Sequence, residues 1–183
     1  MIAGFGAVTL GLAVTTRGIG FSVRGEPSGV EARLAYAVRG WLMPPGARAA
    51  ANAVVLTPEV LESGMAHWAD HCATCHANDG SGDTAIGRSL YPPAPDMRRG
   101  RSQQMTDGEL FYVIERGIPF TGMPAWGTGT AEGERLSWEL VRFIRHLPSL
   151  TASDITKMEQ LNPKSALRPD LEKQMRDFLK GGR

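Results

Sequence analysis

The chain of 183 residues is 42% hydrophobic and 21% charged, which suffices for one core of modest size but hardly for two. Its formal net charge of +1 predicts neither nucleic-acid binding nor a strongly polarised surface. The two cysteines lie in one short motif, between residues 72 and 76, so we expect no structural disulfide.

The N-terminal segment from Ile2 to Thr16 is apolar and carries no charge. It is shorter than the roughly 20 residues that a spanning helix needs, and it fits a membrane anchor, a signal-peptide core or a truncated remnant. No basic region precedes it and no small-residue cleavage site ends it, which counts against a cleaved signal peptide. Arg17 and Arg24 follow it on the side that would face outward, which counts against a simple anchor because basic residues favour the inner side. We expect residues 1–19 to be an uncleaved anchor, with a cleaved signal peptide as the alternative.

Residues 20–56 are predicted to form a connector. Apolar residues recur at helical spacing between Val30 and Met43, which predicts an amphipathic helix that packs on the next domain or lies at the membrane surface. Packing is the simpler interpretation. The run Pro44-Pro45-Gly46 would end this helix, and the small residues up to Val55 would form a tether.

The domain predicted for residues 57–148 opens with a helix that leads into the most informative motif. Thr57 suits the N-cap position and Pro58 suits the first turn. The helix should reach Cys72-Ala73-Thr74-Cys75-His76, which has the spacing that attaches a c-type haem. Two thioether bonds from Cys72 and Cys75 would fix the porphyrin, and His76 would bind its iron.

Two other chemistries compete for this motif. A redox-active Cys-x-x-Cys dithiol belongs at a helix start in a βαβ setting, whereas here the motif follows a predicted helix. Zinc accepts mixed sulfur and nitrogen ligands, and His67 and His71 stand close to the motif, but such a site would be unusually compact. We expect His67, His71 and His146 to be exposed helix residues without a special role.

The middle of the domain alternates loops with one short helix. The segment from Asn78 to Gly87 is rich in turn residues and suits a loop that folds around the edge of the haem. Thr106 and Glu109 have the spacing of a capping box. The helix that they open should end at Gly117, a residue type that favours the position after the last turn.

A second iron ligand is expected in the loop from Gly117 to Trp126. Met123 lies there among glycines and prolines, whose backbone stiffness would fix its position, and its thioether could reach the haem face opposite His76. Most of the eight methionines should fill the core, and Met97, which follows a proline-rich loop, is the competing ligand. We prefer Met123 because it is braced on both sides and Trp126 can shield the haem from water.

The last helix of the domain should run from about Glu132 to Leu147 with one apolar face. Residues 149–183 are predicted to form a helical tail, with a short helix from Ser153 through Leu161 and a weakly amphipathic stretch from Leu167 to Leu179. This tail could cap the domain or extend into solvent. No stretch alternates like a strand for long, so the predicted fold class is all-α, with a few helices and long loops wrapped around one covalent haem.

The Cys72–His76 motif, the Thr121–Trp126 loop and the helix around Leu140 to Ile144 together resemble a class I, single-haem cytochrome c domain. The resemblance covers about residues 58–147 and implies the cytochrome c-like fold. In that family a glycine of the first helix packs against an aromatic residue of the last helix, and here Gly64 and Phe143 stand in those places.

The resemblance also implies a hydrogen bond that orients the axial histidine. A proline carbonyl in the loop after the motif should accept the proton on the second nitrogen of His76, and the candidates are Pro92, Pro93 and Pro95. We place Pro93 and Trp126 among the haem surroundings.

The expected function follows from the iron ligands. An iron held by imidazole and thioether has no open position, so it exchanges single electrons and does not activate oxygen or peroxide. The resemblance implies that haem-attachment machinery adds haem c outside the cytoplasmic membrane. We therefore expect an electron carrier rather than an enzyme, either alone or as a subunit of a larger oxidoreductase.

Its expected location is the periplasmic side of the bacterial cytoplasmic membrane, anchored by the N-terminus, with a soluble periplasmic protein as the alternative. Its partners would be redox proteins in the periplasm or at the membrane. Two other functions stay open: a haem enzyme or a gas or redox sensor with a labile Met123 bond, and a zinc or dithiol module.

Overall fold

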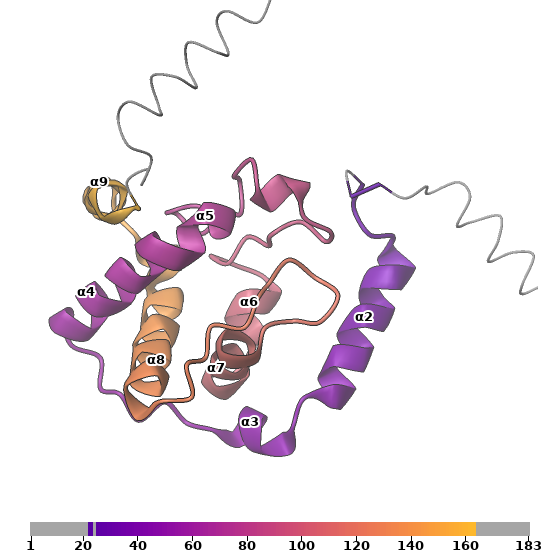
Figure 1. The fold of residues 1–183 in the computed structure, drawn as a ribbon, viewed down its shortest axis with the longest axis horizontal. Helices are drawn as coiled ribbons and strands as arrows, with labels where there is room; N and C mark the ends of the chain where they lie inside the picture. The colour runs from indigo at the N-terminus through magenta and orange to yellow at the C-terminus, as the bar shows by residue number, and fades with distance from the viewer. Residues whose placement is uncertain (1–21, 24, 164–183) are drawn as a thin grey trace, which may run out of the picture.

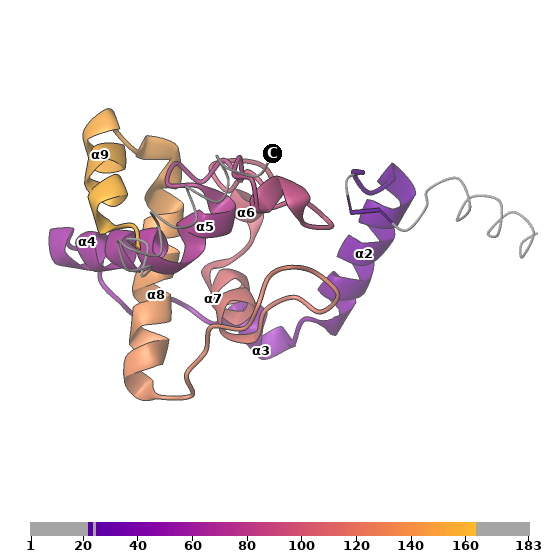
Figure 2. The same ribbon diagram turned by 45° about the horizontal axis from the view of Figure 1, so that its top comes forward.

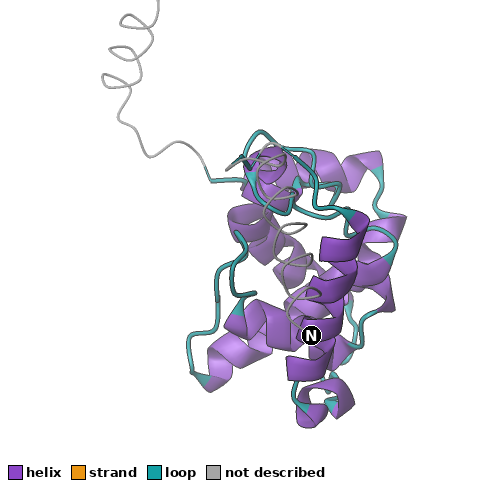
Figure 3. Ribbon diagram, turned by 90° about the vertical axis from the view of Figure 1, so that its right-hand side faces the viewer, coloured by secondary structure: helices purple, strands orange, loops and turns teal. Residues whose placement is uncertain are grey.

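The computed structural model describes residues 22, 23 and 25–163. Within these ranges the chain forms helices joined by loops, without a strand (Figure 3), which confirms the predicted all-α class. The apolar segment from Ile2 to Thr16 and the stretch from Leu167 to Leu179 lie outside the described residues. None of the helices in the described part is both long and apolar enough to cross a bilayer.

Two helices, α4 (Pro58–His67) and α8 (Ala131–His146), cross at the centre of the core (Figures 1 and 2). At the crossing, a Cβ atom added to Gly64 would lie 2.6 Å from the carbonyl oxygen of Glu139 and 2.8 Å from Cβ of Phe143. The predicted contact between Gly64 and Phe143 is confirmed, because the two backbones approach so closely that no side chain fits between them. The largest fully buried side chains among the described residues are Trp68, Phe143, Leu140, Ile144, Leu147, Met158 and Val141.

Two helices of the core begin at the capping residues that the sequence predicted, and one of them ends as predicted. Thr57 caps α4 by accepting a hydrogen bond from an amide of the first turn at 3.3 Å. Thr106 and Glu109 make both hydrogen bonds of a capping box at the start of α7 (Asp107–Arg116). Gly117 ends α7 with a φ of 68°, which glycine adopts without strain.

The segment before the core is not a loose tether. Helix α2 (Gly29–Leu42) forms close to the predicted bounds and runs along one side of the molecule (Figure 1). Helix α3 (Pro45–Ala49) follows it and packs on α7, where Gly108 leaves room for α3 carbonyls. The guanidinium of Arg142 donates to the carbonyls of Val54 at 2.9 Å and Asn52 at 3.0 Å. These hydrogen bonds hold the segment against α8.

The tail after α8 caps the domain rather than trailing in solvent over its described part. A 3-10 turn (Leu147–Ser149) leads into α9 (Ala152–Leu161), which lies across α4 (Figure 2). Met158 of α9 is completely buried, and Lys157 pairs with Glu62 of α4 at 2.6 Å. The apolar contact of Met158 carries most of this docking, since an exposed ion pair contributes little.

Candidate haem site

The Cys72–His76 motif lies at the end of a continuous helical rod. Helix α4 passes into a π-helical turn (Trp68–Cys72) and then into α5 (Ala73–His76), and π turns often occur at functional sites. The indole Nε1 of Trp68 donates to the carbonyl of Ala77 at 3.0 Å. The Trp68 ring lies 5.7 Å from the ring of His76 and 5.9 Å from that of Phe143, centroid to centroid. Trp68 therefore fixes the motif to the core.

The two cysteines carry free thiols, and Cys72 packs against the core. Burial, with a smaller contribution from Cys75, raises the pKa of the Cys72 thiol to about 12. Because the thiolate is the form that exchanges disulfides and binds zinc, this environment does not favour a reactive dithiol. Two free thiols at the end of one helix suit covalent attachment of a porphyrin.

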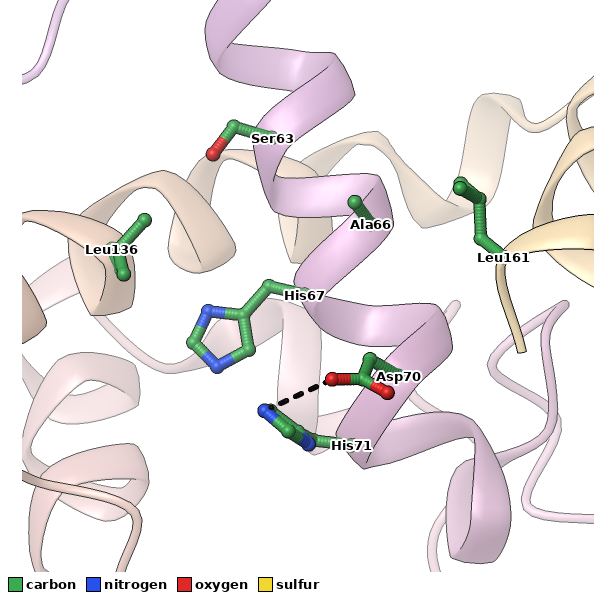
Figure 4. A pocket seen from close by; sticks show the side chains of 7 residues that line it. All are labelled: Ser63, Ala66, His67, Asp70, His71, Leu136 and Leu161. Atoms are coloured by element: carbon green, nitrogen blue, oxygen red, sulfur yellow. Dashed lines mark ion pairs between the residues drawn. The ribbon is translucent and has the colours of Figure 1, made fainter. Parts of the chain in front are cut away.

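His67 and His71 line a separate surface pocket (Figure 4), which also contains Ser63, Ala66, Asp70, Leu136 and Leu161. Nε2 of His71 lies 3.3 Å from Oδ2 of Asp70, and the two histidine rings meet edge-on with centroids 5.1 Å apart. In the part of the chain that the structure describes, no three His, Cys, Asp or Glu side chains gather so that they could hold a metal ion. The compact zinc arrangement is therefore not formed.

The prediction that these histidines are exposed is only partly correct. His71 is exposed, but His67 and His146 are half-buried. Nδ1 of His67 is fully enclosed, and burial, followed by the neighbouring His71, lowers its pKa. The cause is tertiary, because α8 covers this side of α4.

The imidazole of His76 is arranged as a metal ligand would be. Its Nδ1 atom is buried and has no hydrogen-bond partner of normal geometry. Burial lowers the pKa of the ring, and the backbone carbonyl of Pro95, acting as a hydrogen-bond acceptor, opposes this shift. Burial disfavours the charged form of this ring, and a nearby backbone carbonyl can orient it, as is usual for a histidine that binds a metal. Of the three candidate prolines, Pro95 is the one whose carbonyl interacts with the ring, and the placement of Pro93 near the haem stays a prediction.

The loop after the motif folds back onto it, as its turn-rich sequence predicted. The amide of Gly82 donates to the carbonyl of His76 at 2.8 Å, and the hydroxyl of Thr84 donates to the carbonyl of Thr74 at 2.9 Å. A Cβ atom on Gly87 would overlap the carbonyl oxygen of Cys75. These close approaches hold the motif from its solvent side.

The loop that carries Met123 is pinned at its base to the end of α7. The amide of Trp126 donates to the carbonyl of Ile114 at 2.9 Å, and the amide of Ile118 donates to the carbonyl of Met123 at 3.0 Å. Inside the loop, the hydroxyl of Thr121 accepts from the Met123 amide at 3.1 Å. The backbone around Met123 is therefore fixed by hydrogen bonds as well as by prolines.

Contacts on both sides of Met123 bring this loop to the motif. Gly122 lies against the side chain of Leu90, which belongs to the loop that folds over the motif. The ring of Trp126 stacks on that of His71, with centroids 5.1 Å apart and planes at 19°. His71 directly precedes Cys72, so the two contacts flank the haem-attachment sequence.

Met97, the competing ligand, packs against the core. Its side chain is partly buried, and its amide donates to the carbonyl of Gly80 at 2.7 Å. This is the core-filling role expected of most methionines.

The segment from residue 59 to residue 144 matches the model of a protein family described as "Cytochrome C oxidase, cbb3-type, subunit III". This segment is a class I cytochrome c domain. A cytochrome c domain binds haem c and transfers electrons, and the buried His76 and the two free thiols fit that cofactor. The match begins in α4 and ends in α8, so α2, α3 and α9 lie outside it.

Two features of this cytochrome c domain had no signal in the sequence. The stacking of Trp126 on His71 joins residues 55 positions apart, and no local pattern marks such a pair. The hydrogen bond from Trp68 to Ala77 also had no signal, because a tryptophan on a helix is usually a core residue. The close approach at Gly87, in contrast, was signalled by the glycines of that loop.

Proposed function

We propose that this cytochrome c domain is a one-electron carrier with a single haem c, attached through Cys72 and Cys75 and coordinated by His76 and Met123. The observation that carries the proposal is a pair of contacts of the methionine loop, Gly122 with Leu90 and Trp126 with His71, the residue before the motif. When bound, haem c supplies an iron that cycles between the ferric and ferrous states.

The residues of the chain would set the properties of that iron. A thioether ligand favours the ferrous state and raises the reduction potential relative to two histidines. The Pro95 carbonyl would orient His76 and increase its basicity. With both axial positions filled, the site would pass electrons and leave no position for a substrate.

The proposed location is the extracytoplasmic face of a bacterial membrane, because haem c is attached outside the cytoplasm. The uncharged segment from Ile2 to Thr16 supports membrane attachment. The matched family is named for a subunit of an oxidase, which supports a role beside, or as part of, a larger oxidoreductase. Its partners would be redox proteins of the periplasm or the membrane.

The ligand assignment is tested by absorption spectra after expression with a haem-attachment system. A covalent c-type pyridine haemochrome with one haem per chain is expected. The ferric far-red band from sulfur to iron should disappear in Met123→Leu and persist in the matched variant Met97→Leu. A band that survives in Met123→Leu would overturn the assignment, and a high-spin ferric wild type would favour the enzyme or sensor.

A further inference from the structure

Helix α2 turns its apolar side away from the protein. Its stripe consists of residues three or four positions apart, which lie on one side of a helix: Val30, Leu34, Val38 and Trp41. Their side chains are 77%, 64%, 45% and 84% exposed. No residue of α2 is buried, so this is the opposite of the arrangement of a helix that packs on its own domain.

Residues of α2 outside the stripe fix the helix to the domain through polar and aromatic contacts. Arg101 of the short helix α6 (Arg101–Gln104) lies over the ring of Tyr36, 4.0 Å from its centroid. The guanidinium of Arg48 donates to the carbonyl of Gly40, and the hydroxyl of Tyr91 donates to Glu31 at 2.7 Å. Turning the stripe inward would break all these contacts, so its outward orientation belongs to the fold.

We propose that α2 lies in the interfacial region of a membrane, with the stripe inserted among lipid head groups and acyl chains, and that it orients the cytochrome c domain on the bilayer. Only residues 17–28 separate it from the uncharged apolar segment that ends at Thr16. Trp41 is the residue type that favours the boundary between lipid and water. The inference rests on the proposed attachment to a membrane.

Charge supports a lipid surface as the occupant. Arg33 borders the stripe, and Arg17 and Arg24 come between α2 and the apolar segment. The single acidic residue of α2, Glu31, is bonded to Tyr91. Arginines beside an apolar stripe are attracted to anionic head groups.

A second copy of the chain fits the stripe less well. A helix of 14 residues is about 21 Å long and roughly 10 Å wide, so its outer face offers on the order of 200 Å². A stable dimer buries about 800 Å² on each partner. A bilayer makes no such demand, because a short amphipathic helix needs only a second membrane signal to bind firmly.

The test measures the depth of single nitroxide labels on the full chain, bound to vesicles of phosphatidylcholine with phosphatidylglycerol. Both native cysteines are expected to carry haem, so a cysteine introduced as Val30→Cys or Leu34→Cys is the only free thiol. Gln160→Cys on α9 is the matched exposed control. In the ferrous state, the ratio of oxygen to nickel-chelate collision rates should be several-fold higher at positions 30 and 34 than at 160.

A second pair of variants separates the stripe from general hydrophobicity. Trp41→Glu should return the label at position 30 to aqueous accessibility, whereas Val55→Glu, at an exposed site outside α2, should not. Labels at 30 and 34 that stay aqueous on bound protein would overturn the inference, as would failure of the chain to bind vesicles. If the labels were shielded from both oxygen and the nickel chelate, and the protein sedimented as a dimer, the stripe would be covered by a second copy of the chain and not by lipid. The haem spectrum reports independently on the proposed function.

Discussion

Replacing Gly64 with alanine should separate the two helices that form the core. The added Cβ would lie 2.6 Å from the backbone carbonyl oxygen of Glu139 and 2.8 Å from Cβ of Phe143. Carbon atoms in contact are normally about 3.5–4.0 Å apart, so α4 and α8 must move by roughly 1 Å. Neither obstacle is the end of a flexible side chain, and the strain cannot be relieved by a rotamer change.

The expected magnitude is the difference between two opposing effects. Overpacking in a close-packed core costs about 1–3 kcal/mol, with larger values where backbones collide. Replacing glycine by alanine inside a helix contributes about 1 kcal/mol of stabilisation. For Gly64→Ala we expect a net loss of about 1–2 kcal/mol in the free energy of unfolding, because the upper part of the steric range applies.

The measurement is guanidinium unfolding of the haem-loaded protein, followed by far-ultraviolet circular dichroism. Gly40→Ala in α2 is the matched control, since its Cβ would meet only a flexible arginine end at 3.5 Å. That control should leave stability unchanged or raise it by up to about 1 kcal/mol. If Gly64→Ala were as stable as the wild type, the close crossing of α4 and α8 would be wrong.

Two further perturbations address the loops around the site. Trp126→Ala should remove the stack on His71 and lower the denaturant concentration at which the far-red sulfur-to-iron band is lost; Phe120→Ala, a fully exposed position of the same loop, should not. A hydrogen bond from Arg98 lowers the pKa of Asp96 to about 2. A carboxyl group whose pKa is lowered in the folded state stabilises the fold above about pH 3.8, and this stabilisation is lost as the pH falls towards 2. Arg98→Gln should therefore cost about 1 kcal/mol at pH 7, after allowance for solvent screening, and little at pH 2 by thermal unfolding. A cost that does not change with pH would refute the ionic explanation.

Much of the local structure could be predicted because its causes are local. Thr57, Thr106 and Glu109 cap helices through bonds to residues three positions away, and such bonds depend only on the sequence nearby. The haem motif is equally local, since two thiols and an imidazole within five residues are presented by a single helix end. The Gly64 and Phe143 pair is long-range and was predicted through the family resemblance.

Other features depend on which surfaces meet in three dimensions. The sequence allowed three prolines to face His76, and the path of the loop over α5 selected Pro95. It predicted a tether before the domain, but Arg142, far along the chain, binds the carbonyls of that segment. His67 is half-buried only because α8 covers it.

The sequence by itself determined the cofactor-binding motif and the capped starts of α4 and α7, because spacing, capping and turn residues act within a few positions of the chain. The tertiary structure decided that the loop carrying Met123 contacts Leu90 and His71, that α9 caps the core, and that α2 shows its apolar side outward. The spacing of apolar residues shows that a helix has an apolar and a polar side, but only packing determines which of the two sides contacts the rest of the protein.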